Sequence, residues 1–197
     1  LEKFKAIPMP KEREEDWRYT NIDKFNPDNF DLNGAKTKIL AAELSEDLAE
    51  KGVILTDINT AFEKHPIARE YFLKGIKIDK DKFIAFNASH FNNGIFLYVP
   101  KNVELEEPIR ASFNFDGQAS VLHNLIVVDS NSKVSVIEEY SNSEIPKEQL
   151  NSGITEIFAN DNSKINFYHI NNWTKNAYNF TNIIGTAERD SIINFIS

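Results

Sequence analysis

Alternating apolar and polar positions dominate the chain from about residue 93 onward, whereas the first 92 residues carry a mixed, partly helical pattern. Residues 95–99 are a run of strand formers, and Ile109 to Phe115 places every second, apolar side chain on one face. A period of two is typical of β-strands with one buried face. We therefore predict a small α-helical and mixed region over residues 1–92 and a β-rich core over residues 93–197.

Helix signals lie in the first region. The composition of Ala41 to Lys51 favours a helix, and Gly52 is a residue type common just beyond helix ends. Asp57 is a typical N-cap for a second helix. Pro66 suits the first turn of a third helix, where its missing N–H costs nothing.

Three segments of the core repeat one pattern, a short apolar strand, a polar turn and an alternating strand. These segments are residues 125–137, 156–168 and 182–196. Lys133 and Lys164 hold the same place in the pattern, and the second strands open at Val134, Ile165 and Ile192. A hairpin meander also has strand–turn–strand units, but stacked parallel coils require the same polar turn at the same phase in every copy. The repeat therefore predicts a mainly β fold, a right-handed parallel β-helix.

Composition and charge narrow the classes of partner. The chain has 197 residues, 41% of them hydrophobic, and a formal net charge of −8. Nucleic acid and anionic membrane surfaces are disfavoured because both require a concentrated basic surface. We also predict no membrane span, since no apolar stretch approaches the roughly 20 residues required. The charged start does not resemble a signal peptide, so a cytoplasmic protein is expected.

Candidate catalytic and metal-binding residues are sparse. The absence of cysteine excludes disulfides, thiolate ligands and a cysteine nucleophile within this chain. None of the four histidines has metal-ligand spacing, and no phosphate-binding glycine loop occurs. We expect no metal site, no cofactor held by this chain alone and no enzymatic activity.

Acidic residues in the repeated turns leave an alternative open. Asp129, Asp161 and Asp190 fall in the three turns, and aligned carboxylates on a β-helix could bind calcium or act as acid and base on a sugar. A β-helix carbohydrate-active lyase or hydrolase and a purely structural β-solenoid are therefore two alternatives that these residues leave open. Aspartate is also common in turns because it bonds to its own backbone.

Short motifs along the chain resemble those of one protein family, in the same order. Residues 93–103, followed by Pro108-Ile109, resemble the pattern G-x-F-x-x-V-P-x-G-V and then P-I/L of the SufB/SufD family. Residues 16–21 resemble the Trp-Arg/Lys-Tyr-Thr motif near the start of SufD proteins. Residues 82–88 resemble the segment F-x-A-L-N-x-A, and residues 172–179 resemble its Q-N-W…Y-N stretch.

This resemblance implies a scaffold subunit for iron–sulfur cluster assembly. It implies pairing through the β-helix with a SufB-like subunit or a second copy. A SufC-type ABC ATPase would dock on a C-terminal region missing here, and the cluster would belong to the assembled complex. It further implies a tunnel or interface role for one group of residues, His169, Asn171, Asn172 and Trp173, and a docking role for Trp17, Arg18 and Tyr19.

Departures from the family pattern favour a SufD-like role. Tyr140 stands where SufB-like sequences carry a cysteine, and Ile183-Ile184 stand where they carry Lys-Arg. Asn171 replaces the glutamine before Asn-Trp. The sulfur-relay chemistry of SufB is therefore not expected. The last repeat ends at Ser197 in mid-pattern, so we expect a fragment of a longer protein or an edge covered by a partner.

Overall fold

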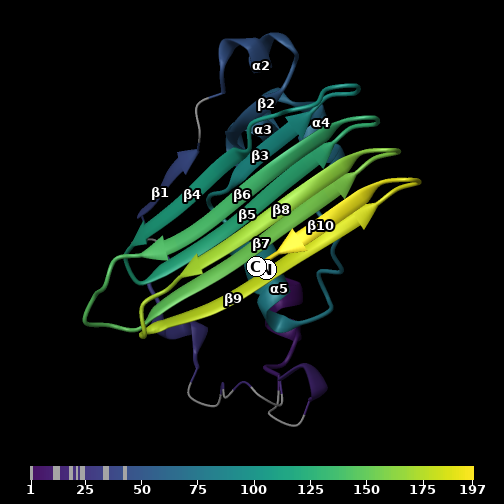
Figure 1. Cartoon of the computed structure of the whole chain (residues 1–197). Helices are drawn as coiled ribbons and strands as arrows, with labels where there is room; N and C mark the ends of the chain where they lie inside the picture. Colours follow the sequence, from purple (N-terminus) through teal and green to yellow (C-terminus); the bar gives the residue numbers. More distant parts are fainter. Residues whose placement is uncertain are drawn as a thin grey trace.

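Two five-stranded β-sheets lie face to face and form the body of the molecule (Figure 1). The computed structural model describes residues 2–10, 14–17, 20, 22, 25–32, 36–41 and 44–197. Sheet A has the strand order β1-β4-β6-β8-β10, and sheet B has the order β2-β3-β5-β7-β9. The strands are β1 Lys36–Ala41, β2 Ile54–Asp57, β3 Ile95–Val99, β4 Ile109–Asp116, β5 Ala119–Val128, β6 Lys133–Asn142, β7 Gln149–Ala159, β8 Lys164–Asn172, β9 Ala177–Ala187 and β10 Ile192–Ile196. The helices are α1 Glu2–Ala6, α2 Glu46–Glu50, α3 Ile58–Lys64, α4 Pro66–Tyr71 and α5 Lys82–His90, with 3-10 turns η1 Glu15–Trp17 and η2 Pro27–Asn29.

From β3 onward the chain alternates between the two sheets, and each strand from β5 on pairs in parallel with the strand one coil earlier. β5 pairs with β7 from Ala119↔Leu150 to Val128↔Ala159, and β6 pairs with β8 from Lys133↔Lys164 onward. Parallel neighbours joined through the opposite sheet define a β-helix, here of about four turns. The predicted parallel β-helix is confirmed.

The repeat register is confirmed for the second and third coils and wrong by one residue for the last. Val134 lies beside Ile165, as the repeat predicts, but Ile193 rather than Ile192 lies beside Ile165. Ile193 packs against the interior cluster that contains Ile165, whereas Ile192 is half exposed. Because side chains alternate between faces, a slip of one residue would place Ile192 inside and leave Ile193 in solvent.

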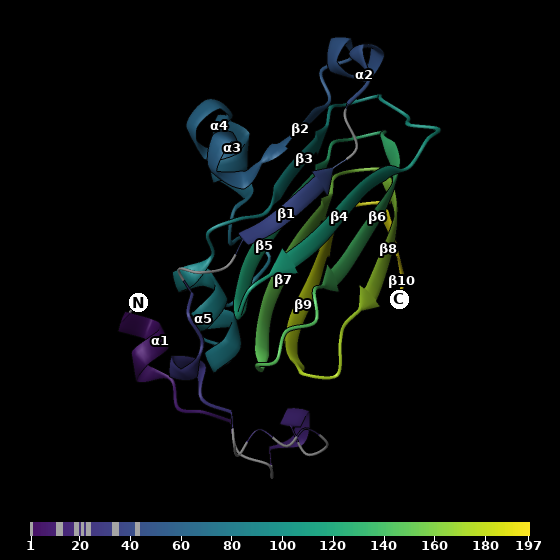
Figure 2. The same cartoon turned by 90° about the vertical axis from the view of Figure 1, so that its left-hand side faces the viewer.

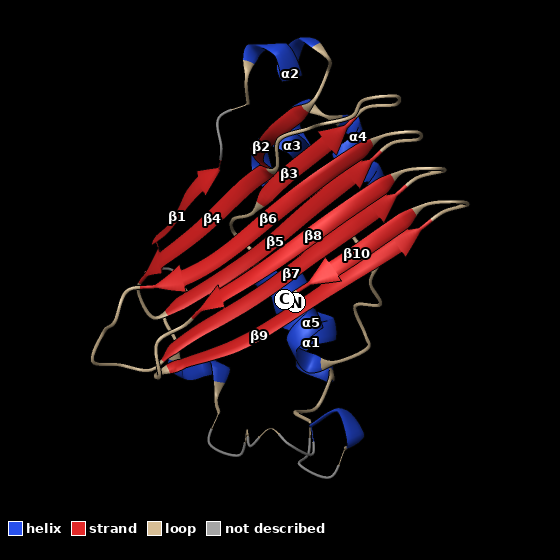
Figure 3. Ribbon diagram, viewed as in Figure 1, coloured by secondary structure: helices blue, strands red, loops and turns tan. Residues whose placement is uncertain are grey.

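The turns that lead from sheet B to sheet A stack on each other along one side of the β-helix (Figure 3). Asn102, Asn131 and Asn162 adopt left-handed φ values of 63°, 59° and 57°, and Asp190 continues the series at 58°. Their side chains form a ladder, since Asn131 Nδ2 donates to Asn102 Oδ1 at 3.0 Å and Asn162 Nδ2 donates to Asn131 Oδ1 at 2.9 Å. Asparagine tolerates this backbone conformation better than most residues, which accounts for the repeated polar turn.

Three helices, α3, α4 and α5, lie against one face of the β-helix. Figure 2 shows α3, α4 and α5 against the outer face of sheet B, and every residue of β5 and β7 is buried as a result. Two strands from the first region, β1 and β2, pair antiparallel with β4 and β3. They cover the edge of the first coil, where unpaired backbone groups would otherwise be exposed. The division into two domains at residues 92 and 93 stays a prediction.

Local signals in the first region are partly confirmed. The Asp57 side chain caps α3 by accepting from Thr60 N at 2.9 Å, and Pro66 opens α4. The helix predicted over Ala41 to Lys51 is present as α2, but the prediction is wrong at Ala41, which ends β1 and pairs with Ala111 of β4. Sheet pairing outweighs the high helix propensity of alanine at this position. Among the described helices, none is long and apolar enough to cross a membrane.

Candidate functional site

The interior of the β-helix divides into an apolar half and a polar half. In β6 the inward residues Val134 and Val136 belong to the apolar cluster, whereas the next inward residues, Glu138 and Tyr140, meet polar neighbours. We define the polar half by its buried side chains, Asn124, Glu138, Tyr140, Asn151, Thr155 and His169. Such a concentration of polar groups inside a core is unusual and is a candidate functional site.

Glu138 lies at the centre of the polar half and is fully buried. Its Oε1 accepts from Asn124 Nδ2, and Thr155 Oγ1 lies 2.9 Å from Oε1 and 3.0 Å from Oε2. His169 Nδ1 lies 3.2 Å from Oε2. These hydrogen bonds replace the water that a carboxylate loses on burial.

Tyr140 extends the network from the same strand. Its hydroxyl accepts from Asn124 Nδ2 at 2.8 Å, and its ring stacks on Phe113 with a centroid distance of 4.9 Å. Burial raises the pKa of Tyr140 well above its usual value, and the nearby charge of Glu138 raises that pKa further. The phenol is therefore neutral over the physiological pH range.

The predicted tunnel or interface residues fall into two groups. His169 is 6% exposed and bonded to Glu138. Trp173 packs toward Phe115 and Tyr140 at centroid distances of 5.8 and 5.9 Å, and its Nε1 donates to Asn171 Oδ1 at 2.9 Å. His169, Asn171 and Trp173 therefore lie together beside the polar half. Asn172 pairs with Ser141 and alternates to the outer face of sheet A.

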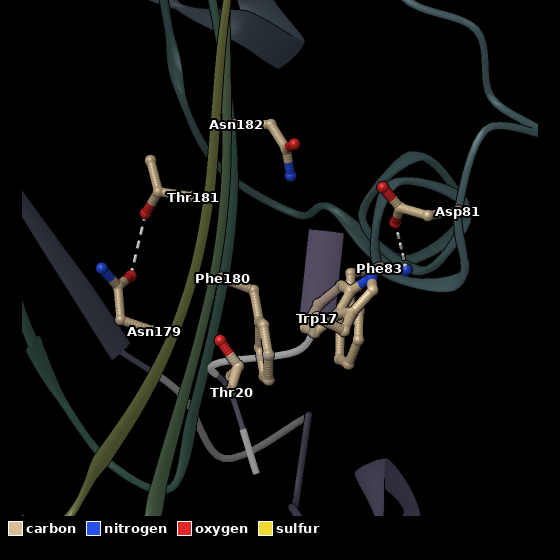
Figure 4. Close-up of a pocket in the computed structure, with 8 residues that line it drawn as sticks. All are labelled: Trp17, Thr20, Asp81, Phe83, Asn179, Phe180, Thr181 and Asn182. Carbon is tan, nitrogen blue, oxygen red and sulfur yellow. Dashed lines mark hydrogen bonds between the residues drawn. The ribbon is translucent and has the colours of Figure 1, made fainter. Parts of the chain in front are cut away.

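Trp17 of the predicted docking motif lies at a separate cavity of about 260 Å³ between α5 and β9 (Figure 4). Phe83 and Phe180 stack at a centroid distance of 3.8 Å, and Trp17 lies 4.9 Å from Phe83. On the rim, Asp81 Oδ1 caps α5 by accepting from Phe83 N at 2.8 Å. Arg18 and Tyr19 lie outside the described residues, so the structure places only Trp17 of this motif.

The acidic turn residues have local partners. Asp129 Oδ1 accepts from Ser130 N at 2.7 Å, and Asp161 pairs with Arg189 at 3.0 Å. Burial acts to raise the pKa of Asp129, but hydrogen bonds from Ser130, Asn160 and Tyr98 outweigh it and lower that pKa. Within the described residues, no group of three or more histidine, aspartate or glutamate side chains is placed to hold a metal ion.

Glu138 was not identified from the sequence, although a signal for it exists. Val134, Val136, Glu138 and Tyr140 share one strand face, and a carboxylate on an otherwise apolar face indicates a buried, paired charge. The hydrogen-bond partners of Glu138 could not be identified from the pattern of a single strand. Asn124, Thr155 and His169 come from three other strands, and only the coil register brings them together.

Comparisons with known proteins point to one protein family over most of the chain. Residues 111–197 match the family model described as SUF system FeS cluster assembly, SufBD core domain, and residues 38–111 match the SufBD protein N-terminal region. The iron–sulfur cluster assembly protein SufD of Bacillus subtilis is 33% identical, over 98% of this chain and 52% of that protein. Iron–sulfur cluster assembly SufBD family proteins of Staphylococcus epidermidis and Staphylococcus aureus are 30% and 29% identical, over 73% of this chain and 32% of theirs. The chain thus spans about half the length of the Bacillus protein.

Proposed function

The chain belongs to the SufB/SufD family, and on that premise we propose that it is a SufD-like scaffold subunit of an iron–sulfur cluster assembly complex. The observation that carries the proposal is the parallel β-helix whose residues 111–197 match the family's core. A scaffold of this kind binds partners and holds a cluster in transit without turning over a substrate itself. The cluster is cargo of the assembled complex, which we place in the cytoplasm.

A supporting rather than sulfur-carrying role follows from the chemistry of the interior. Sulfur relay requires a thiol, and the chain has no cysteine. At the position where the resemblance places the SufB cysteine, Tyr140 is fully buried and hydrogen-bonded to Asn124. A neutral buried phenol is neither a nucleophile nor a soft metal ligand. This chain would therefore support a SufB-like partner that carries the thiol.

The proposed partners are a SufB-like subunit, or a second copy, bound through the β-helix, and a SufC-type ABC ATPase. The chain spans about half of the Bacillus protein, and we assign no residue of this chain to ATPase docking. The test is anaerobic affinity purification of the full reading frame containing this segment, with co-purifying proteins identified by mass. Recovery of an ABC-type ATPase and a SufB-like protein in fixed proportion supports the proposal. Recovery of neither, or robust cleavage of acidic polysaccharides by the purified chain, contradicts it.

Within this role, we assign the predicted tunnel or interface function to the end of the polar half marked by His169, Asn171 and Trp173. On the same interior, a Cβ built at Gly153 would meet its nearest atoms at 3.6 Å, an ordinary contact distance. Buried Asn151 Oδ1 also has no hydrogen-bond partner in the described part of the chain. An unsatisfied buried acceptor on this interior supports the assignment.

Matched substitutions separate this site from the outer surface. We expect Trp173→Ala to lower cluster yield in the reconstituted complex by roughly tenfold, as loss of a central interface or positioning aromatic does. Asn172→Ala, one residue away but facing outward, should leave cluster yield unchanged. Equal yields from the two variants would remove the assignment while leaving the scaffold proposal intact.

A further inference from the structure

A second buried polar cluster lies on the opposite side of sheet B, under the helices. His123 of β5, Glu156 of β7 and Asn87 of α5 are each fully buried. His123 and Glu156 face away from the polar half because neighbouring residues of a strand alternate between faces. Asn87 meets them from α5. The family resemblance assigns no role to this cluster, but its hydrogen-bond geometry indicates one.

The orientation of the Asn87 amide is determined by its neighbours. Asn87 Nδ2 donates to two backbone carbonyls, Leu122 O and Ser152 O, both at 2.9 Å. The opposite orientation would place an oxygen against two oxygens. Asn87 Oδ1 therefore faces His123 Nδ1, at a distance of 3.1 Å.

Glu156 is surrounded by donors. Its Oε1 accepts from Leu73 N at 2.8 Å, and its Oε2 accepts from Gly75 N at 2.9 Å. His123 Nε2 lies 3.0 Å from Oε1. Because each oxygen accepts a backbone N–H, the ionised carboxylate, with both oxygens as acceptors, fits this site better than the protonated form.

Both ring nitrogens of His123 therefore face acceptor oxygens. A neutral imidazole carries one N–H and one lone pair, so the neutral ring would leave a lone pair against Asn87 Oδ1 or against the carboxylate. We propose that His123 is held as the imidazolium cation and forms with Glu156 a buried ion pair that clamps the Phe72–Gly75 turn and α5 onto sheet B.

The surroundings of the ring fit a cation. The rings of Phe72 and Phe91 lie 4.7 and 5.4 Å from the imidazole centroid, within the range of cation–π attraction. Glu156 supplies the opposing charge and Asn87 a neutral amide oxygen. The clamp acts on a turn that needs restraint, because Leu73 has a left-handed φ of 60°.

The direct test is nitrogen NMR of the wild-type chain labelled at its histidines, at neutral pH. An imidazolium has a proton on both ring nitrogens, so we expect two N–H signals with similar shifts for His123. Loss of these signals in His123→Gln identifies them. A single N–H signal beside a far-shifted unprotonated nitrogen for this ring would overturn the proposal.

A substitution then tests the clamp. Glu156→Gln removes the charge, so His123 should become neutral and the amides of Leu73 and Gly75 should exchange with solvent roughly 10- to 100-fold faster, as loss of charge-assisted hydrogen bonds implies. Glu139→Gln changes an exposed glutamate of sheet A and should alter neither measurement. Unchanged exchange of both amides in Glu156→Gln, with the β-core amides still protected, would overturn the clamp.

Discussion

Glu138 is a charged side chain at the centre of a β-helix core, and its hydrogen bonds make that position tolerable. Asn124, Thr155 and His169 surround its carboxylate within the buried interior. An unpaired buried carboxylate would be very unfavourable, but a fully bonded one specifies which strands lie beside each other. The same strand carries Glu139 on its outer face, where the carboxylate pairs with Arg110 at 3.5 Å in solvent.

The two neighbouring glutamates should respond very differently to truncation. Glu138→Ala leaves three buried hydrogen-bond donors without an acceptor. We expect the free energy of unfolding to fall by about 3–5 kcal/mol. Glu139→Ala removes a solvent-exposed pair and should cost less than about 1 kcal/mol. Urea unfolding of both variants measures the difference. Similar losses for the two would mean that the interior network contributes little to stability.

Gly94 is required by a close backbone approach. Its φ is 147°, and a Cβ built there would lie 1.9 Å from the carbonyl oxygen of His123. Gly153, also inside the β-helix, would place a Cβ no closer than 3.6 Å to any neighbour. The two glycines therefore differ in the space around them although both lie within the same fold.

Alanine substitution should separate these two positions. For Gly94→Ala we expect a loss of about 3 kcal/mol or more, because a strained φ and an overlap with backbone act together. For Gly153→Ala we expect a change within about 1 kcal/mol, because alanine also restricts the unfolded chain. Thermal and urea unfolding provide the comparison, and a well-tolerated Gly94→Ala would contradict the structure at this turn.

The turns between strands determine how successive coils stack. Each of three consecutive turns places an asparagine in the left-handed region, and the side chains bond from one coil to the next. One residue type thus supplies both the backbone conformation and the contact between neighbouring turns. This is the physical reason why polar turns recur every 28 to 31 residues in the sequence.

Substitutions at the middle of the ladder distinguish its two contributions. Asn131→Val should lower the free energy of unfolding by about 1–3 kcal/mol, since a β-branched residue is strained at positive φ. Asn131→Gly keeps the backbone relaxed and loses only exposed side-chain hydrogen bonds, so its cost should stay below about 1 kcal/mol. Urea unfolding compares the two variants. A larger loss for the glycine variant than for the valine variant would show that the side-chain ladder matters more to stability than the backbone conformation.

Across the whole molecule, the buried Tyr140 and the partly buried Tyr98 make stability depend on alkaline pH. Burial, reinforced by the charge of Glu138, raises the pKa of Tyr140 well above the usual 10.0. Burial raises the pKa of Tyr98 to about 12, and its bond to Asp129 contributes. Above pH 10.0 the unfolded chain loses these protons while the folded chain retains them. Because the folded state then binds more protons, stability falls as pH rises.

These two tyrosines predict how the free energy of unfolding depends on alkaline pH. The free energy of unfolding should be insensitive to these tyrosines below pH 10.0 and should fall above it, with Tyr140 contributing about 1.4 kcal/mol per pH unit. Tyr140→Phe should reduce this slope and leave the smaller share of Tyr98. Urea unfolding over a series of alkaline pH values measures both slopes. Identical slopes for wild type and variant would contradict the burial of the Tyr140 hydroxyl.

The sequence was sufficient for features that depend on local patterns. Period-two alternation identified the strands, repeated polar turns identified the parallel coils, and Asp57 and Pro66 marked helix starts. These signals are readable because backbone conformation and exposure depend mainly on neighbouring residues. Family motifs added the expected role through resemblance rather than through physics.

Tertiary pairing accounts for what the sequence left undetermined. Ala41 joins a strand rather than a helix because β4 offers it backbone partners, and Ile193 rather than Ile192 faces inward because the coil register requires it. Glu138 meets His169, and Glu156 meets His123, across adjacent coils about 30 residues apart. Side chains so distant in sequence become neighbours only when strand register is set, since a shift of one residue turns every side chain to the opposite face.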